Sequence, residues 1–381
     1  MNTFKMLTTI HFGENALDHL KEIPYQRIMV IMDPFVYTSG LYKQITEPLE
    51  AAHKEYTIFS DVVPDAPLDK ISAGVKAFLE YKPYAIVAVG GGSAIDSSKS
   101  IREFALKINP YGKVGLIAIP TTSGTGSEVT AFAVVNDTQA KVKYPLVSDS
   151  LTADEAILDA ALVTSVPPSI TADTGMDVVT HALEAYVSTQ HNEFSAALAE
   201  KALEICGVFL PRCYYDGQDM HARQKMHVAS CLAGLAFNTA SLGLNHGMAH
   251  QLGATFHIPH GRANAMLLPH IIEFNSDINK HSKSQKEYLP AVKRYATVAQ
   301  ILGLSSYNKI MTVRSLVNWV QFMLKEMDIP LSISQMGTIS KEEYFNAIDR
   351  MADAALADAC TATNPRVPTK EDVVKMYQNL W

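Results

Sequence analysis

Histidines are concentrated in one short part of this sequence. The chain contains 13 histidines in 381 residues, and five of them fall between residues 246 and 270. Within this segment His246, His250, His257 and His260 belong to a single run, HGMAHQLGATFHIPH. Imidazole is the commonest metal ligand in proteins and the side chain that titrates nearest neutral pH. The cluster therefore predicts a metal site or a site of proton transfer.

A carboxylate and a further imidazole occur upstream, in a segment with the features of a helix start. Asp177 and His181 follow Pro167-Pro168 and precede the helix-forming residues Ala-Leu-Glu-Ala. Side chains four residues apart lie on the same face of a helix, so both can bind one divalent ion. An ordinary side-chain pair on a helix is the alternative explanation of this spacing. The histidine cluster favours the metal site.

Two loops in the first half of the chain follow predicted buried strands. Gly90-Gly-Gly-Ser93 precedes a predicted helix, and residues 120–128, PTTSGTGSE, carry five hydroxyl side chains. Glycines allow a ligand close to the backbone, and a helix N-terminus attracts phosphate. We expect both loops to bind a dinucleotide, although the common G-x-G-x-x-G pattern is absent. A tight turn and a plain loop are the alternatives.

An acidic residue, Asp33, ends the first predicted strand. A carboxylate in this position can accept hydrogen bonds from a ribose diol and repel a 2′-phosphate, which favours NAD over NADP. The sequence is equally consistent with Asp33 opening a turn with Pro34.

The first 163 residues alternate short apolar runs with helical patterns, which is typical of a parallel sheet covered on both faces. The predicted strands are residues 27–32, 84–89 and 115–119, and the predicted helices are residues 41–53, 69–81 and 94–107. Residues 129–147 alternate in polarity and contain the turn signal Asn136-Asp137. We interpret them as a hairpin added to a Rossmann-like α/β domain.

From residue 164 onward the pattern is helical, with a break at Ser165-Val-Pro-Pro-Ser169. The predicted helices include residues 196–209, 223–237, 288–302 and 313–326. We therefore expect a dinucleotide-binding α/β domain over residues 1–163 and an all-helical, metal-binding and catalytic domain over residues 164–381.

Composition excludes several classes of protein. Hydrophobic residues make up 48% of the chain, and the net charge is −7 without a basic block, which argues against nucleic-acid or anionic-membrane partners. No apolar run is long enough for a transmembrane helix, and the first residues lack the apolar segment of a signal peptide. The four cysteines form no regular framework, which is typical of a reducing, cytoplasmic compartment.

Four motifs in this order resemble the iron-dependent (group III) alcohol dehydrogenase family. They are GGGSAID at 90–96, PTTSGTGSE at 120–128, GMDVVTHALE at 175–184, and HGMAHQLG at 246–253 followed by PHG at 259–261. The resemblance covers nearly the whole chain. It implies a Rossmann-like domain followed by an all-helical domain, the fold shared with dehydroquinate synthases.

The resemblance also implies the roles of individual residues. One divalent metal, usually Fe(II) with Zn(II) as the alternative, would be held by Asp177, His181, His246 and His260. His250 would help to move the proton, and His257 stays outside the ligand set. NAD would contact the residues of the two loops and their surroundings, namely Asp33, Gly91, Gly92, Ser93, Asp96, Thr121, Thr122, Thr125 and Lys143.

The activity implied is hydride transfer between NAD(H) and a small primary alcohol or aldehyde. Few cationic side chains lie near the metal residues, Arg262 being the nearest in sequence, so a small neutral substrate is expected. Residues 1–4, 243–246 and 363–366 are similar to family members that convert propanal to 1-propanol in bacterial propanediol utilisation. This branch implies a homodimer associated with a bacterial microcompartment.

Other functions remain open at this level. Within the family, the alternatives are a 1,3-propanediol dehydrogenase and a lactaldehyde reductase. A zinc- and NAD-dependent lyase of the dehydroquinate synthase type would need several cations for its phosphate and carboxylate groups, and the metal region is poor in them. A scaffold that binds metal without catalysis is a further alternative, but every expected ligand is present.

Overall fold

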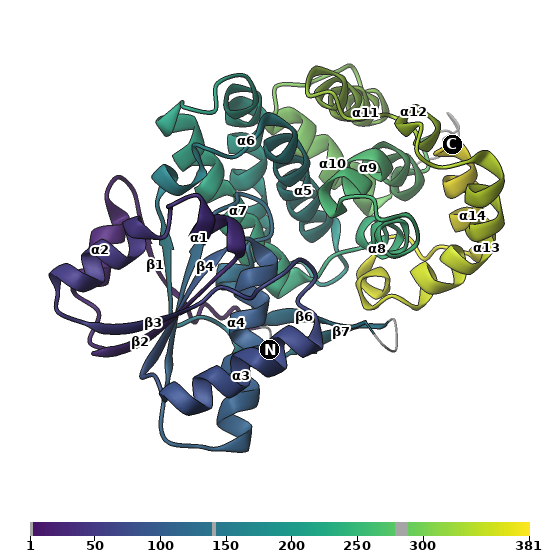
Figure 1. Cartoon of the computed structure of the whole chain (residues 1–381). Helices are drawn as coiled ribbons and strands as arrows, with labels where there is room; N and C mark the ends of the chain where they lie inside the picture. Colours follow the sequence, from purple (N-terminus) through teal and green to yellow (C-terminus); the bar gives the residue numbers. More distant parts are fainter. Residues whose placement is uncertain (1–2, 139–141, 279–288) are drawn as a thin grey trace. The chain divides into compact units, whose positions relative to one another are not determined.

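Six strands between residues 9 and 158 form a parallel sheet in the order β1-β8-β5-β4-β2-β3. The computed structural model describes residues 3–138, 142–278 and 289–381, and the chain forms two compact units, residues 1–165 and 166–381 (Figure 1). The strands of the sheet are β1 (Thr9–Phe12), β2 (Arg27–Met32), β3 (Glu55–Phe59), β4 (Ala85–Gly90), β5 (Gly115–Pro120) and β8 (Glu155–Leu158). The three strands predicted from apolar runs are confirmed as β2, β4 and β5.

Both faces of this sheet are covered, as the continuous apolar strands predict. Along β2, Met29 and Ile31 pack with helices α3 (Leu68–Tyr81) and α4 (Gly92–Ile108). The alternate residues Ile28 and Val30 face the other layer. That layer consists of η1 (Ala16–Lys21), α1 (Pro34–Thr38) and α2 (Lys43–Ala51).

The strand order changes direction between β2 and β4. From β2 the chain passes to β3 on one side and then returns to β4 on the other. In open α/β sheets, ligands bind at such a switch point, beyond the carboxyl ends of the strands. Asp33 directly follows β2, and Gly91 directly follows β4. The fold therefore brings two predicted cofactor contacts to the place where a ligand is expected.

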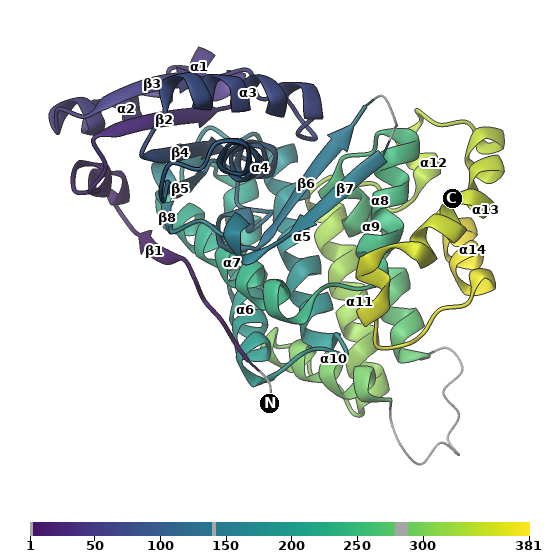
Figure 2. The ribbon, with the colours of Figure 1, turned by 90° about the horizontal axis from the view of Figure 1, so that it is seen from below.

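The predicted hairpin is present as β6 (Phe132–Asp137) and β7 (Val142–Val147), an antiparallel pair separate from the main sheet (Figure 2). The predicted position of its turn is wrong. Asn136 and Asp137 are paired with Lys143 and Val142 in the ladder, so β6 continues through the dipeptide. The extended pairing of the two strands overrides the local turn preference of Asn and Asp.

The described part of the second unit contains helices and no strand, which confirms the all-helical prediction. Its α-helices are α5 (Pro168–Val187), α6 (Glu193–Tyr215), α7 (Met220–Ala240), α8 (Leu244–Phe256), α9 (His260–Ser276), α10 (Pro290–Ile301), α11 (Lys309–Glu326), α12 (Ile333–Met336), α13 (Lys341–Ala357) and α14 (Lys370–Asn379). Among the described residues no single helix has the length and hydropathy to span a membrane, although α7 and α8, bent by 108°, meet both conditions as a pair.

Helix α5 lies at the centre of the second unit. It begins with Pro168 at its first position, where proline is tolerated because its N–H is not needed, and it is buried from Gly175 to Val187. It packs against α6, α7 and α9, while α8 packs against α9 and α13. Three helices that carry the predicted metal ligands, α5, α8 and α9, are thus held by buried contacts.

Candidate functional site

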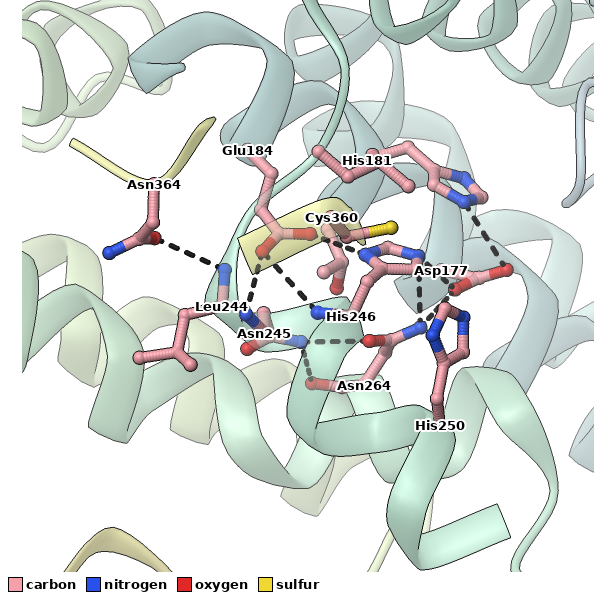
Figure 3. A network of polar contacts seen from close by, with 12 residues as sticks. Asp177, His181, Glu184, Leu244, Asn245, His246, His250, Asn264, Cys360 and Asn364 are labelled. Carbon is pink, nitrogen blue, oxygen red and sulfur yellow. Dashed lines mark hydrogen bonds and ion pairs between the residues drawn. The ribbon is translucent and has the colours of Figure 1, made fainter. Parts of the chain in front are cut away.

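The four predicted metal ligands converge in the second unit, close to the network drawn in Figure 3. Asp177 and His181 lie on α5, His246 lies on α8, and His260 is the first residue of α9. One ligand atom from each side chain lies within 4.8 Å of the other three. Asp177 Oδ1 is 3.7 Å from His246 Nε2 and 3.6 Å from His260 Nε2. Asp177 Oδ2 is 3.9 Å from His181 Nε2.

These donors have the burial expected of a metal centre. Asp177, His181 and His246 are buried, whereas the His260 side chain is 44% exposed. Burial lowers the pKa of His246 well below its ordinary value, and the neighbouring imidazoles of His181, His260 and His250 lower it further. His246 is therefore neutral, which is the form that binds a metal.

The carboxylate of Glu184 determines which nitrogen of His246 faces Asp177. Glu184 Oε2 is hydrogen-bonded to His246 Nδ1, and Glu184 Oε1 accepts a hydrogen bond of 2.7 Å from the backbone N–H of Asn245 at the start of α8. With the proton on Nδ1, the Nε2 lone pair is directed toward Asp177. Burial raises the pKa of Glu184 to about 8, despite the backbone hydrogen bonds from Asn245 and His246. A cation bound at Nε2 would favour the ionised carboxylate.

The side-chain amide of Asn264 lies at the place toward which three of the four ligand atoms are directed. Its Nδ2 lies 2.8 Å from Asp177 Oδ1 and 3.1 Å from Nε2 of both His246 and His260. Its Oδ1 accepts a hydrogen bond of 2.9 Å from Asn245 Nδ2, which fixes the orientation of the amide. An NH₂ group has two hydrogens for these three acceptors. A divalent cation among the same lone pairs can contact all of them, so the donor set fits a metal ion.

Gly261 allows α9 to start directly against α5. A Cβ added at Gly261 would lie 2.1 Å from the carbonyl oxygen of Asp173 and 3.3 Å from Asp177 Cβ. The neighbouring Arg262 donates from Nε to Asp173 Oδ1 at 3.1 Å. The glycine and the ion pair thus position His260 beside Asp177, and they explain the Pro-His-Gly sequence at this place.

His250 lies beside the four ligands and is held by a carboxylate of its own. It is one helical turn after His246 on α8, and its Nδ1 is 2.8 Å from Asp358 Oδ2. Its ring stacks on that of His260 with a centroid distance of 5.5 Å. Burial alone would raise the pKa of Asp358, but the hydrogen bonds from His250 and the backbone N–H of Cys360 outweigh it, and the pKa is lowered. An ionised carboxylate therefore orients His250.

Two further side chains of this unit lie outside the set of four ligands. His257 is exposed and ends α8 with a left-handed φ of 56°. The ring of Phe237 lies 4.7 Å from that of His181, so it forms an apolar boundary of the ligand set.

In the first unit, Asp33 lies between the turn that follows β2 and the glycine loop. Its Oδ1 accepts a hydrogen bond of 2.9 Å from Val36 N and so caps α1. Its Oδ2 lies 2.8 Å from the position of a Cβ added at Gly90, whose φ of 148° favours glycine. One oxygen therefore stabilises the turn, while the other lies against the glycine loop.

The two predicted loops pack against each other. Gly91 caps α4 and Gly92 is its first residue, which directs the free N–H groups of the helix into the loop region. A Cβ added at Gly91 would lie 3.4 Å from Thr122 Oγ1, and one added at Gly92 would lie 2.8 Å from Thr125 Cγ2, so the second loop leaves room only for glycine at Gly92. Ser93 Oγ accepts a hydrogen bond of 3.1 Å from Asp65 N. This arrangement of backbone donors and hydroxyls suits a pyrophosphate.

The structure gives the remaining predicted cofactor residues different environments. Asp96 accepts hydrogen bonds from Ser127 Oγ at 2.6 Å and from Val134 N at 3.0 Å, so both carboxylate oxygens bond to the protein and hold the second loop on α4. Thr121 is buried, and its N–H donates to Gly90 O at 3.0 Å. Lys143 lies in β7, and its side chain is outside the part of the chain that the structure describes.

Two models of one protein family match the chain. The model described as "Iron-containing alcohol dehydrogenase" matches residues 8–160, and that described as "Fe-containing alcohol dehydrogenase family, C-terminal" matches residues 171–381. The chain belongs to the iron-containing alcohol dehydrogenase family. This finding confirms the resemblance that the four motifs indicate, together with the enzyme class.

Individual members of the family are similar over the full length. The 1-propanol dehydrogenase PduQ of Citrobacter freundii is 40% identical, with 100% of each chain covered. The NADPH-dependent butanol dehydrogenase of Clostridium saccharobutylicum is 36% identical over 99% of this chain and 97% of the relative. The crystal structure of a 1,3-propanediol oxidoreductase superposes with a TM-score of 0.90 at 28% identity, covering 100% of each chain.

Three residues of this iron-containing alcohol dehydrogenase site were not predicted from the sequence. Glu184 had a usable signal, because positions 177, 181 and 184 follow helical spacing and carry the only charged or imidazole side chains between Gly175 and Val187 of α5. Asn264 lies one helical turn after His260, which is a weaker signal. Asp358 is 108 residues from His250, and no local pattern connects the two.

Proposed function

We propose that this protein is an iron- and NAD-dependent alcohol dehydrogenase that interconverts propanal and 1-propanol. The observation that carries the proposal is the convergence of one carboxylate and three imidazoles, with His246 held neutral and oriented by Glu184. The full-length similarity to a 1-propanol dehydrogenase supports the choice of substrate.

Asp177, His181, His246 and His260 would hold a single divalent ion. One carboxylate and three imidazoles suit Fe(II) and also accept Zn(II), because imidazole is a good ligand for both. When bound, the ion supplies a Lewis acid that polarises the oxygen of the alcohol or aldehyde. The family supports Fe(II) as the native metal.

The loops of the first unit would hold the dinucleotide. The N-terminus of α4 offers free N–H groups to a pyrophosphate, and Gly91, Gly92 and Ser93 form its first turn. Bound NAD supplies the hydride acceptor at its nicotinamide ring. We propose NAD rather than NADP because Asp33 Oδ2, beside Gly90, would repel a 2′-phosphate.

His250 would move the proton that the reaction releases or consumes. Asp358 holds the Nδ1 of His250, which leaves Nε2 to exchange a proton with the substrate oxygen or a water molecule. The substrate would be neutral, since Arg262, the cationic residue nearest to the ligands in sequence, is paired with Asp173, which offsets its charge. Phe237, against His181, adds apolar surface suited to a short alkyl chain.

The unit of residues 1–163 would bind the dinucleotide, and that of residues 164–381 would bind the metal and carry out catalysis.

We also propose that the protein is a homodimer of the bacterial cytoplasm that works with a propanediol-utilisation microcompartment. Its similarity to a protein named PduQ supports this assignment. Light scattering of the purified protein tests the dimer, and fractionation of cells with intact microcompartments tests the association.

A comparison of aldehydes tests the proposed substrate. Protein purified without oxygen is assayed for NADH oxidation with propanal, butanal, 3-hydroxypropanal and lactaldehyde. We expect the highest kcat/KM with propanal. A clear preference for 3-hydroxypropanal would instead assign the activity of a 1,3-propanediol oxidoreductase, which the structural match also supports.

The coenzyme is tested in the same assay. NADH should be used in preference to NADPH, and Asp33→Ala should shift the ratio of kcat/KM toward NADPH by about tenfold, equivalent to about 1.4 kcal/mol. Asp33→Asn keeps an oxygen to cap α1 while it removes the charge, so it should shift the ratio without loss of stability. An unchanged ratio in both variants would remove Asp33 from coenzyme selection.

A further inference from the structure

A second group of metal-binding side chains lies at one edge of the sheet, in the first unit. His11 is on β1, His19 is on η1, and Glu155 is the first residue of β8. Strand β5 separates β1 and β8 from β4 and β2, whose ends carry the glycine loop and Asp33. Two neighbouring elements at the start of the chain, β1 and η1, and the distant strand β8 therefore bring two imidazoles and a carboxylate together, away from the proposed nucleotide loops.

Both imidazoles point at the same carboxylate oxygen. The Oε2 of Glu155 is 3.1 Å from His11 Nε2 and 2.6 Å from His19 Nε2. The two rings stack with a centroid distance of 3.6 Å and an interplanar angle of 18°. Ligand atoms bound to one tetrahedral Zn²⁺ at about 2.0–2.2 Å lie roughly 3.3–3.6 Å from one another. All three ligand atoms of this group lie within 4.8 Å of one another, so a small shift of the side chains would accommodate an ion.

The surroundings of the group suit a bound cation. The side chains of His11, His19 and Glu155 are 29%, 23% and 18% exposed, so they are shielded but accessible to an ion and a water molecule. The carboxylate of Glu22 lies 4.0 Å from His19 Nδ1, on the opposite side of the ring from Glu155. A negative charge there favours the proton on Nδ1 and leaves the Nε2 lone pair for a metal.

We propose that His11, His19 and Glu155 bind a divalent transition-metal ion, with Zn²⁺ as the probe, at a site separate from the proposed iron site. Two imidazoles and one carboxylate are a recognised donor set for Zn²⁺ and leave a fourth position for water. A bound ion would connect the edge strand β1 to η1 and β8, and would stabilise this part of the sheet.

A titration of metal-depleted protein with Zn²⁺ tests the proposal, with bound metal counted by equilibrium dialysis and elemental analysis. Wild-type protein should bind two ions per chain. His19→Ala and Glu155→Gln should each bind one, with the affinity of the lost site reduced more than about 100-fold, since removal of a direct ligand should cost more than removal of an outer partner. The exposed His221, on α7, provides the control, because His221→Ala should still bind two.

Glu155→Gln should fold like the wild type, because the amide oxygen still accepts a hydrogen bond and the side chain keeps its size. A loss of metal binding in this variant therefore does not come from misfolding. Without metal its melting temperature should equal that of the wild type, and Zn²⁺ should raise the wild-type value more than that of the variant. Propanal reduction by His19→Ala should be unchanged, so this proposal and the proposed function fail independently. A wild type that binds one ion, or variants that still bind two, would overturn the proposal.

Discussion

The Nδ1 atom of His246 is hydrogen-bonded to the side-chain carboxyl group of Glu184. The same carboxylate accepts a hydrogen bond of 2.7 Å from Asn245 N, and Asn364 Oδ1 accepts one of 3.2 Å from Leu244 N (Figure 3). The first N–H groups of α8 are thus bound by side chains from α5 and from the segment before α14. The start of the helix and the orientation of the metal ligand depend on one buried network.

Loss of the Glu184 carboxylate should weaken metal binding. Glu184→Ala removes the partner that keeps the proton on Nδ1 of His246, and outer partners of this kind affect metal affinity by about 10- to 100-fold. Metal retained after dialysis against a graded series of chelator concentrations measures the effect. Glu204, exposed on α6, gives the matched control, since Glu204→Ala should retain metal as the wild type does. Equal retention in both variants would contradict the role of Glu184.

The two histidines one helical turn apart on α8 should have different effects. His246→Ala should lose both metal and activity, because it removes one of the four converging donors. His250→Ala should keep the metal and lose about 100-fold or more in kcat, in the range of general acid–base catalysis. Elemental analysis and steady-state NADH oxidation on the same preparations separate the cases. Equal metal loss in both variants would argue against the division of labour.

Asp358 should act through His250. Asp358→Asn leaves a side chain of the same size but removes the charge that orients the imidazole, so kcat should fall by about 10- to 100-fold with full metal content. KM should change little, because Asp358 contacts His250 and not the four converging ligands. A useful second variant is Asp358→Glu, which should recover part of the rate. If the rate is unaffected by Asp358→Asn, the dyad has no part in proton transfer.

A methyl group at Gly261 should disturb both stability and the metal site. The added Cβ would lie 2.1 Å from the carbonyl oxygen of Asp173, so α9 must move away from α5. Overpacking of this kind costs about 1–3 kcal/mol in the free energy of unfolding. Gly253→Ala is the comparison, because its Cβ would meet Ile258 O at 3.5 Å, an ordinary contact, and alanine favours the helix by about 0.5–1 kcal/mol. In urea denaturation, Gly261→Ala should lower the free energy of unfolding and Gly253→Ala should raise it. In elemental analysis, only Gly261→Ala should have lost metal.

The sequence predicts well those strands that a continuous run of apolar residues identifies. β2, β4 and β5 are buried on both faces, and their apolar runs identify them directly. Strands β1 and β3 lie at the two edges of the sheet and are only partly buried, so their residues do not form such runs. These strands are defined by pairing with distant partners, which local sequence does not reveal.

The same difference applies to the site. Asp177 and His181 are one turn apart on α5, so helical spacing placed them on one face, and the histidine cluster indicated that they bind a metal. Asp96 is predicted to contact the cofactor, and its oxygens also accept hydrogen bonds from Ser127 and Val134, which the motif does not reveal. A motif shows that a residue belongs to a loop, whereas contacts made across the fold decide whether its side chain faces a ligand or the protein.

The most direct test of the proposed metal-dependent dehydrogenase is NADH oxidation with propanal by protein purified without oxygen, measured before chelation, after chelation, and after Fe(II) or Zn(II) is added back. The four converging donors predict that activity disappears with the metal and returns, to the greatest extent with Fe(II). Full activity in metal-depleted protein, or no activity with propanal at one bound iron per chain, would contradict the proposed function.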